Sequence, residues 1–314
     1  MNLVDHQQVA ARLDWSALIA ALRESLAARR IEAPPRQMLS IPMPGGGTAS
    51  LLIMPAWEAG QAIGVKVVTF LPENADKGLA TINAGYLLFD GATGQAVAAI
   101  DGDALTERRT AATSALAADY LARRDASVLM ICGTGQVASV LAAAHASVRR
   151  YSRILIWGRN GDKAQDCARK IARLGLPAEA CEDLEQGCRA ADVVSSATAA
   201  TQPFIRGEWL REGSHLDLIG AFKPDMRECD SLCVTQARIF VDGREGALLA
   251  GDLADPVAEG LFNPARIAGD ISDLASGALA GRRSDRERTL FKSVGLSAED
   301  LIAARLAAED KRHP

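Results

Sequence analysis

The middle of the chain alternates between short apolar runs and longer segments in which apolar residues recur every three or four positions. Short continuous apolar runs are typical of buried strands, and the longer spacing is typical of helices. The expected strands are residues 128–132, 153–157, a short one near 178, 192–197, 215–220 and 238–242. The expected helices are the alanine-rich segment that follows Gly135 and extends to 145, and residues 163–174 and 184–190. Strands that alternate with helices predict a parallel sheet wound on both faces, which binds ligands beyond the carboxyl ends of its strands.

The first third of the chain has a second pattern, in which strand-length runs follow one another with short turns between them. An amphipathic helix is predicted over residues 15–29, and Pro34-Pro35 ends it and extends the chain. The expected strands are residues 37–41, 49–54, 62–71, 86–89 and 96–100. Such short connections predict antiparallel pairing. The glycines at 45–47 lack a following Lys-Ser/Thr pair, so we interpret them as a hairpin turn and not as a phosphate-binding loop.

A long helix is predicted from about residue 103 to 124, and the chain ends with a strand near 290–295 and a helix from 297 to about 309. Ser297 and Asp300 have the spacing of a capping box at the start of that last helix. Together the patterns predict an α/β protein of two domains. These are a Rossmann-type doubly wound parallel sheet over residues 116–289 and an α+β domain with an antiparallel sheet, formed by residues 1–115 with 290–314.

The strand at 128–132 leads into a turn with the pattern G-x-G-x-x-A, at Gly133, Gly135 and Ala138. The first glycine permits the bend, the second lets a pyrophosphate approach the backbone, and the N–H groups that open the helix attract an anion. Arg159 follows the next strand, where an acid usually binds the ribose 2′-hydroxyl of NADH. Because an arginine can bind a 2′-phosphate instead, the predicted cofactor is NADPH, with NADH less favoured. The alternative is that Arg159 is an ordinary solvated loop residue.

Two cationic side chains fall on faces that are otherwise apolar. Lys66 shares one face of its strand with Val68 and Phe70, and Arg109 interrupts the apolar stripe of the long helix. A buried lysine needs an anion or loses its proton, and a lowered pKa suits proton transfer. The alternative is a lysine that reaches solvent from an edge strand. A buried Arg109 needs a carboxylate or phosphate partner, which either the protein or a ligand could supply.

Composition and charge point to a small-molecule partner. The chain has 314 residues, a net charge of −4 and no long basic run, which argues against binding nucleic acid or an anionic membrane. No apolar stretch reaches about 18 residues and the N-terminus lacks a signal-peptide pattern, so a cytoplasmic location without membrane contact is expected. The six cysteines include no C-x-x-C pair and the four histidines are scattered, so reduced thiols, structural histidines and no metal site are expected.

Five segments together resemble the ornithine cyclodeaminase and mu-crystallin family. They are PPRQ at 34–37, GVKVV at 64–68, LTERRTAATSALAADYLAR at 105–123, ICGTGQVA at 131–138 and FKSVG at 291–295. The run that begins at Arg109 is the most specific of them, since the glycine turn occurs in many dehydrogenases. The resemblance covers nearly the whole chain and implies a homodimer formed through the antiparallel-sheet domain, which would also bind the substrate.

The resemblance also implies roles for individual residues. Arg36, Lys66 and Arg109 would surround the α-carboxylate and the amine or imine nitrogen of the substrate and carry the catalysis. Thr81 would lie beside the nicotinamide, and Val294-Gly295 would form one wall of the substrate site. The residues then expected to bind the cofactor are Thr81, Arg109, Thr110, Gly133, Thr134, Gly135, Gln136, Val137, Arg159, Asn160, Ala197, Thr198 and Gly220.

The chain departs from the cyclodeaminase pattern at two acidic positions. Phe222 occupies the place of an aspartate after the fifth Rossmann strand, and Leu52 occupies the place of a second acid. Asp225 could substitute only if its loop were reshaped. The segment GAFKPDMRE at 220–228 instead resembles the corresponding segment of family members that reduce Δ1-pyrroline-2-carboxylate and Δ1-piperideine-2-carboxylate to L-proline and L-pipecolate. The leading hypothesis is therefore an NADPH-dependent reductase in which Arg36 and Arg109 bind the carboxylate and Lys66 supplies a proton.

Three alternatives stay open. The first is ornithine cyclodeamination with catalytic NAD, which would release ammonia and proline. The second is an alanine-type amino-acid dehydrogenase. The third is a protein of the mu-crystallin kind that binds NADPH and a small carboxylate without turnover. Three cationic substrate positions favour a small carboxylate ligand, but binding alone would also use them.

Overall fold

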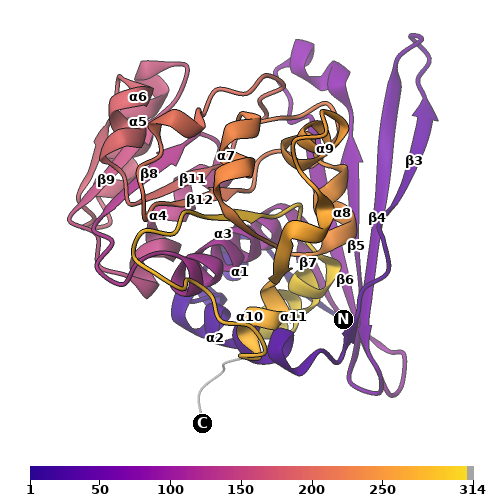
Figure 1. Ribbon diagram of the computed structural model, residues 1–314. Coiled ribbons are helices and arrows are strands. Elements are labelled where there is room, and N and C mark those ends of the chain that lie inside the picture. Colours follow the sequence, from indigo (N-terminus) through magenta and orange to yellow (C-terminus); the bar gives the residue numbers. More distant parts are fainter. Residues whose placement is uncertain (310–314) are drawn as a thin grey trace. The chain divides into compact units, whose positions relative to one another are not determined.

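The computed structural model describes residues 1–309, which form two compact units (Figure 1). The first unit consists of Met1–Arg109 and the chain from Leu296 onward, and the second unit is Thr110–Gly295. The boundaries therefore lie at 109/110 and 295/296 and not at 115/116 and 289/290. The reason at the second boundary is that residues 289–292 pair with strands of the second unit. Residues 310–314, which the expected first domain included, lie outside the described part.

A seven-stranded sheet forms the frame of the first unit. Its order is β1-β7-β6-β5-β4-β2, with β3 also paired to β4. All pairs are antiparallel except β1 with β7. The strands are β1 (Asn2–Val4), β2 (Ile31–Glu32), β3 (Gln37–Pro42), β4 (Thr48–Glu58), β5 (Ala62–Phe70), β6 (Ile82–Asp90) and β7 (Ala96–Asp101). β4 and β6 are longer than expected because each stays paired with β5 along the whole length of that strand.

Helices cover one face of this sheet. The helices of the first unit are α1 (His6–Arg12), α2 (Trp15–Ala28), the short 3-10 helix η1 (Pro72–Lys77) and α11 (Ser297–Ala308). α11 packs against β4, β5, β6 and β7, and α2 packs against α11. The long helix α3 (Gly102–Leu121) begins in the first unit and continues into the second. The face of β5 toward α11 carries Ala62, Gly64 and Lys66, which are all buried.

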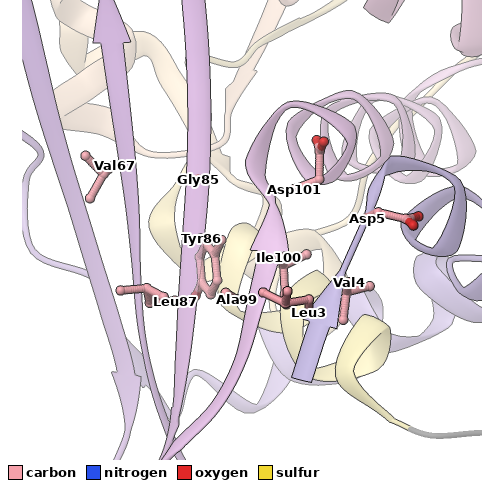
Figure 2. A pocket seen from close by; sticks show the side chains of 10 residues that line it. All are labelled: Leu3, Val4, Asp5, Val67, Gly85, Tyr86, Leu87, Ala99, Ile100 and Asp101. Carbon is pink, nitrogen blue, oxygen red and sulfur yellow. The ribbon is translucent and has the colours of Figure 1, made fainter. Parts of the chain in front are cut away.

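The opposite face of the sheet is apolar and open to solvent. Leu3, Ile63 and Leu87 are exposed there, Leu3 by 76%. A shallow groove of about 490 Å³ runs over β1, β7, β6 and β5, with Val67 and Leu87 among the side chains that line it (Figure 2). An apolar surface of this extent is typical of a region that another protein surface covers.

The second unit is built on an eight-stranded sheet whose pairs are all parallel. Its order is β10-β9-β8-β11-β12-β15-β13-β14. The strands are β8 (Val128–Cys132), β9 (Arg153–Trp157), β10 (Ala178–Ala180), β11 (Val193–Ser196), β12 (His215–Leu218), β13 (Arg238–Val241), β14 (Ile267–Asp270) and β15 (Thr289–Lys292). Successive strands are added on one side of β8 as far as β10, and β11 then starts the other side, so the strand order reverses between β8 and β11, which is where such sheets bind ligands. The expected Rossmann-type fold is confirmed.

The helices of the second unit fill the connections between its strands. They are α4 (Gln136–Val148), α5 (Gly161–Ala172), α6 (Leu184–Ala190), α7 (Ser231–Gln236), α8 (Arg244–Leu249), α9 (Gly251–Ala258) and α10 (Ile271–Ala275), with 3-10 helices η2 (Gly207–Trp209) and η3 (Pro264–Arg266). The sequence pattern missed β14 and α7 to α10, because segments of four to eight residues show too little periodicity. Across residues 1–309, no helix has both the length and the apolar character to cross a bilayer.

Candidate active site

Lys66 lies at the centre of the first unit, on the buried face of β5. Its side chain is only 3% exposed, and β5 is an inner strand that lies between β4 and β6. The ammonium nitrogen donates to Asp300 Oδ1 at 2.9 Å and lies 2.8 Å from Oδ2, with Thr106 Oγ1 at 3.4 Å. Lys66 therefore does not reach solvent from an edge strand. It is a buried cation paired with a buried carboxylate.

Arg109 joins the same carboxylate from α3. Its Nε donates to Asp300 Oδ1 at 2.9 Å, and its Nη1 donates to Glu299 Oε2 at 3.0 Å. Glu299 and Asp300 are fully buried in the first turn of α11. The partner that a buried Arg109 requires is thus supplied by the protein itself, and two acids share the task.

The expected capping box at Ser297 and Asp300 is wrong. α11 begins at Ser297 after the N-cap residue Leu296, whose N–H donates to Glu299 Oε2 at 3.3 Å. The Asp300 side chain turns instead to Lys66 and Arg109, because two full positive charges attract it more strongly than the partial charge of a helix end does. Sequence reasoning missed Glu299 and Asp300 as site residues. The available signal was that two buried cations require acids somewhere in the chain.

The charges of this cluster act on one another. Burial lowers the pKa of Lys66 to about 8, with Arg109 and Arg36 also lowering it and Asp300 opposing them. Burial alone would raise the pKa of Asp300, but Arg109 and Lys66 hold it below its usual value. Lys66 therefore stays mostly protonated near neutral pH and can exchange its proton at mildly alkaline pH.

Of the other residues expected in the first unit, Arg36 lies near this cluster and Thr81 lies beyond the end of the β5–β6 ladder. Arg36 is half-buried just before β3, close enough for its charge to influence Lys66. Thr81 is half-buried just before β6, where its carbonyl accepts the N–H of Leu71 at 2.8 Å. It lies one position beyond the Phe70–Ile82 pair that ends the β5–β6 ladder. Lys66, Arg109 and Arg36 thus form one electrostatic group, and Thr81 lies further along the same strands.

Apolar side chains from β4 border Lys66 on the same buried face. Met54 lies directly opposite Lys66 in the β4–β5 ladder, and Leu52 lies opposite Val68. Met54 and Leu52 are both buried. On this face of the sheet, buried cations therefore lie beside buried hydrocarbon side chains.

The glycine turn of the second unit has the geometry expected of a phosphate-binding turn. Gly133 has φ +130°, and a Cβ atom there would lie 2.6 Å from the carbonyl oxygen of Ala197. Gly135 is the N-cap of α4, makes no side-chain capping bond, and would place a Cβ in open space. Ala138 is fully buried beneath the turn. Backbone N–H groups at the start of α4 are therefore accessible to an anion, with Thr134, Gln136 and Val137 beside them.

Arg159 lies in the turn between β9 and α5. Its side chain is exposed, as is that of Asn160. Asn160 is the N-cap of α5, and its side-chain oxygen accepts the N–H of Lys163 at 3.0 Å. A Cβ at Gly158 would lie 2.7 Å from Thr134 Cγ2, so the turn after β9 packs against the glycine turn after β8. Arg159 therefore lies in the turn after β9, which is the position that the sequence predicted for it.

A buried carboxylate that the sequence analysis overlooked ties together the loops after β11 and β12. Glu228 accepts hydrogen bonds from Ser196 Oγ at 2.6 Å and from the Thr198 N–H and hydroxyl at 2.8 Å. Its other oxygen accepts from the N–H of Gly220 at 2.8 Å and of Ala221 at 3.2 Å. Burial, followed by the charge of Asp252, raises the pKa of Glu228 to about 7. The loops that contain Ala197, Thr198 and Gly220 thus share one acceptor.

A second buried carboxylate shapes the segment after β15. Asp242 Oδ2 accepts from the N–H of Val294 at 2.7 Å, the N–H of Gly295 at 2.6 Å and Ser293 Oγ at 2.9 Å. Gly295 has φ +83°, a conformation that favours glycine. The Val294-Gly295 segment is therefore held in one conformation. Thr110, the first residue of the second unit, is buried in α3.

The two positions that depart from the cyclodeaminase pattern contain no carboxylate. Phe222 is half-buried in the loop after β12, with Lys223 Nζ 5.5 Å from its ring centroid. Asp225 is exposed three residues further on. Leu52 is buried on β4 in the first unit.

One constellation in the second unit has the composition of a catalytic triad but not its geometry. Ser114, His145 and Asp217 are all fully buried. The Ser114 hydroxyl donates to Asp217 Oδ2 and lies 2.9 Å from His145 Nε2, so the serine stands between the other two. Burial lowers the pKa of His145 to about 3. A neutral imidazole without access to solvent has a structural role.

A protein-family model matches almost all of the sequence. Residues 3–313 match the model of the ornithine cyclodeaminase/mu-crystallin family. The chain belongs to this family. The match includes both the Lys66–Arg109 cluster of the first unit and the glycine turn of the second.

Individual family members are similar along their full lengths. A Δ1-pyrroline-2-carboxylate reductase of Colwellia psychrerythraea is 35% identical, over 98% of this chain and 99% of that protein. The solved structure of the Thermococcus litoralis Δ1-pyrroline-2-carboxylate reductase, in complex with NADH and L-proline, has a TM-score of 0.92 and 32% identity, covering 98% and 96% of the two chains. An archaeal alanine dehydrogenase dimer with bound NAD has a TM-score of 0.90 and 28% identity, covering 98% and 95%.

Proposed function

We propose that this protein is an oxidoreductase that reduces a small cyclic imino acid, Δ1-pyrroline-2-carboxylate or Δ1-piperideine-2-carboxylate, to L-proline or L-pipecolate, with NADPH as the hydride donor. The observation that carries the proposal is the buried Lys66–Arg109 cluster beside Leu52 and Met54. It places two buried cations beside an apolar surface, and a cyclic imino acid combines a carboxylate with a hydrocarbon ring. Close relatives that act on such substrates support the same assignment.

Each residue of the cluster has a defined task in this reaction. Arg36 and Arg109 bind the carboxylate through charge-assisted hydrogen bonds and so orient the C=N carbon. When bound, the reduced nicotinamide supplies the hydride to that carbon. The electron pair of the C=N bond moves to nitrogen, which must carry or receive a proton. Lys66 holds that proton at Nζ, and its lowered pKa makes the transfer feasible near neutral pH.

The same surroundings disfavour ornithine as the substrate. Ornithine has a second ammonium group, which needs a carboxylate or other acceptor when it is taken out of water. The two positions where cyclodeaminases place acids contain Leu52 and Phe222 here. An uncompensated ammonium beside Leu52 would be costly, so a neutral hydrocarbon ring is the better ligand.

The preference for NADPH rests on Arg159. The side chain is exposed after β9, near the glycine turn, and can donate two parallel hydrogen bonds to a 2′-phosphate. Arg159→Ala should raise the KM for NADPH by roughly 10- to 100-fold, the value of one charged hydrogen-bonding group, and leave the KM for NADH nearly unchanged. Arg169→Ala on α5 is the matched control, because Arg169 is an exposed arginine that pairs with Asp166. Equal effects on both cofactors would contradict the NADPH assignment.

We further propose that the protein is a homodimer that buries the open face of the first unit's sheet. Ile63 and Leu87 are exposed on that face, and Leu87 lines the groove in Figure 2. The archaeal alanine dehydrogenase relative is a dimer. Leu87→Asp should convert the dimer to a monomer in light-scattering measurements, since a charge at an apolar interface is expensive. A wild-type protein that is monomeric at micromolar concentration would contradict this assembly.

One assay tests the proposed reaction. The purified protein is offered NADPH with pyrroline-2-carboxylate, piperideine-2-carboxylate, pyruvate plus ammonia, or ornithine, and NADH serves as the comparison cofactor. Loss of the NADPH absorbance band with the cyclic imines alone is the expected result. Ammonia released from ornithine without net cofactor consumption, oxidation with pyruvate plus ammonia alone, or tight binding without turnover would each contradict the proposal in favour of a different family activity.

A further inference from the structure

Asp300 is the carboxylate on which the proposed site depends most directly. Its Oδ1 accepts from Lys66 Nζ and from Arg109 Nε, each at 2.9 Å, and its Oδ2 lies 2.8 Å from Lys66 Nζ. The side chain is completely buried. One carboxylate therefore fixes the distance between the two cations that the proposed function assigns to proton donation and carboxylate binding.

The position of Asp300 in α11 favours its ionised form. The residue lies in the first turn of a twelve-residue helix, where the helix dipole and the unpaired N–H groups stabilise negative charge. The preceding residue, Glu299, accepts from Arg109 Nη1 at 3.0 Å. Arg109 is thus held at two of its nitrogens, whereas Asp300 is the only carboxylate in hydrogen-bond contact with Lys66 among residues 1–309.

We infer that Asp300 is a positioning residue for the proposed reduction: it keeps Lys66 protonated and holds Lys66 Nζ and the Arg109 guanidinium in the arrangement that receives the substrate. The inference rests on the proposed function. Asp300 acts through Lys66 and Arg109 and takes no part in bond making itself. Glu299, in contrast, pairs with Arg109 and accepts the N–H of Leu296.

Charged and titratable groups from several elements enter this balance, including Glu299 of α11 through its bond to Arg109. α11 contributes Asp300, α3 contributes Arg109 and the half-buried Asp103, and the segment before β3 contributes Arg36. Tyr86 on β6 lies opposite Lys66, and its high pKa keeps it neutral. Burial, Arg109 and Arg36 all lower the pKa of Lys66, and Asp300 is the group that mainly opposes them. Removing the charge of Asp300 should therefore lower the pKa of Lys66 below about 8.

The pH dependence of kcat/KM reports this change with a definite sign. Lys66 must be protonated to donate, so activity is lost as the pH rises through its pKa. The isosteric change Asp300→Asn should move this alkaline loss of activity to lower pH by about one unit or more, a tenfold or greater shift in the protonation equilibrium. The measurement is reduction of the cyclic imino acid by NADPH between pH 6 and pH 10, with each variant first checked for its Tm and NADPH binding.

Two variants separate positioning from a general structural role. Glu299→Gln removes the charge of a buried carboxylate that is hydrogen-bonded to Arg109, and it should raise the KM for the imino acid without moving the alkaline limb. Asp300→Glu restores the charge and should return the limb to the wild-type pH at a reduced kcat. If Asp300→Asn lowers kcat equally at every pH and leaves the limb in place, the inference is overturned.

A direct titration keeps the inference testable if Asp300→Asn does not fold or if the reaction is a different one. Lysine Cε signals of the ¹³C-labelled wild-type protein are followed by NMR against pH without substrate, and Lys66→Arg identifies the signal of Lys66. A pKa near or above 8 supports the inference, because it shows that a carboxylate offsets the burial. A pKa below 7 overturns it. Failure of the proposed function alone appears as a normal Lys66 titration with no imine reduction.

Discussion

Each unit of the molecule buries a lysine against an aspartate, and the two pairs differ in what surrounds them. Lys292 of the second unit lies 2.9 Å from Asp252 and also donates to the carbonyl oxygens of Leu218 and Ala221. Burial would lower its pKa, but Asp252 and Glu228 raise it above the usual value. Lys66 of the first unit has one carboxylate and one distant hydroxyl, and burial lowers its pKa to about 8.

The same kind of ion pair therefore serves a different purpose in each unit. Lys292 is surrounded by acceptors, so its proton is held permanently, and its bonds link the end of β15 to α9 and to the loop after β12. Lys66 has Arg109 and Arg36 as neighbours, so its charged form is only just favoured. A buried lysine among acceptors stabilises structure, whereas a buried lysine among cations is ready to give up its proton.

The largest effect should come from removing the titrating lysine. Lys66→Met is expected to lower kcat for imine reduction by about 10²- to 10⁴-fold, the usual contribution of a positioned proton donor, while Kd for NADPH changes little. Asp300 keeps its bonds to Arg109 in this variant, so the fold should survive. Steady-state kinetics and a fluorescence titration with NADPH measure the two quantities. Unchanged turnover would mean that Lys66 has no chemical role.

Removing the permanently charged lysine should instead damage stability. Lys292→Met leaves the carboxylates of Asp252 and Glu228 buried without a cation, which typically costs about 3–5 kcal/mol. Calorimetry should show a lower Tm for the second unit. If Lys292→Met were as stable as the wild type and inactive, the contrast between the two lysines would be lost.

A milder change to the same network tests the contribution of charge alone. Asp252→Asn keeps an oxygen for the N–H groups of Glu228 and Cys229, which Asp252 Oδ1 accepts at 2.7 and 3.1 Å. It removes only the charged hydrogen bond to Lys292, so a loss of about 2 kcal/mol is expected, less than for Lys292→Met. Denaturant unfolding of the two variants side by side gives the ranking. The reverse ranking would assign the stability to Asp252 and not to the buried cation.

The smallest effect is a change in the pH profile. Because the pKa of Lys66 lies near 8, wild-type kcat/KM should fall about tenfold per pH unit above that value. Lys66→Arg should remove this alkaline loss up to pH 10, since a guanidinium keeps its proton there, although the rate will be lower throughout. An unchanged alkaline limb in Lys66→Arg would place the titrating group elsewhere.

The residue pattern was sufficient to predict most of the long elements. The strands 128–132 and 153–157 and the glycine turn at Gly133 lie where the periodicity placed them, because a strand–turn–helix unit depends on residues adjacent in sequence. The buried face of β5 was also predictable, because alternation along one strand is a local property. That alternation identified Lys66 as a cation on an apolar face.

Other elements left too weak a signal in the sequence. β14 has four residues, which is only two repeats of the strand pattern, and α10 has five, which is less than two turns of a helix. β15 was recognised as a strand, but its place between β12 and β13 depends on pairing across a long stretch of chain. Pairing partners are chosen by the packed sheet and not by the strand alone.

The sequence by itself determined that two cations, Lys66 and Arg109, occupy apolar faces and that a glycine turn opens a helix, because periodicity along a strand or helix fixes which side a residue takes. Only the tertiary structure decided which acids those cations meet. Asp300 is 234 residues from Lys66 in sequence, and its spacing from Ser297 suggested a helix cap. Burial of opposite charges at close range outweighs such a local preference, and only the folded chain brings the charges together.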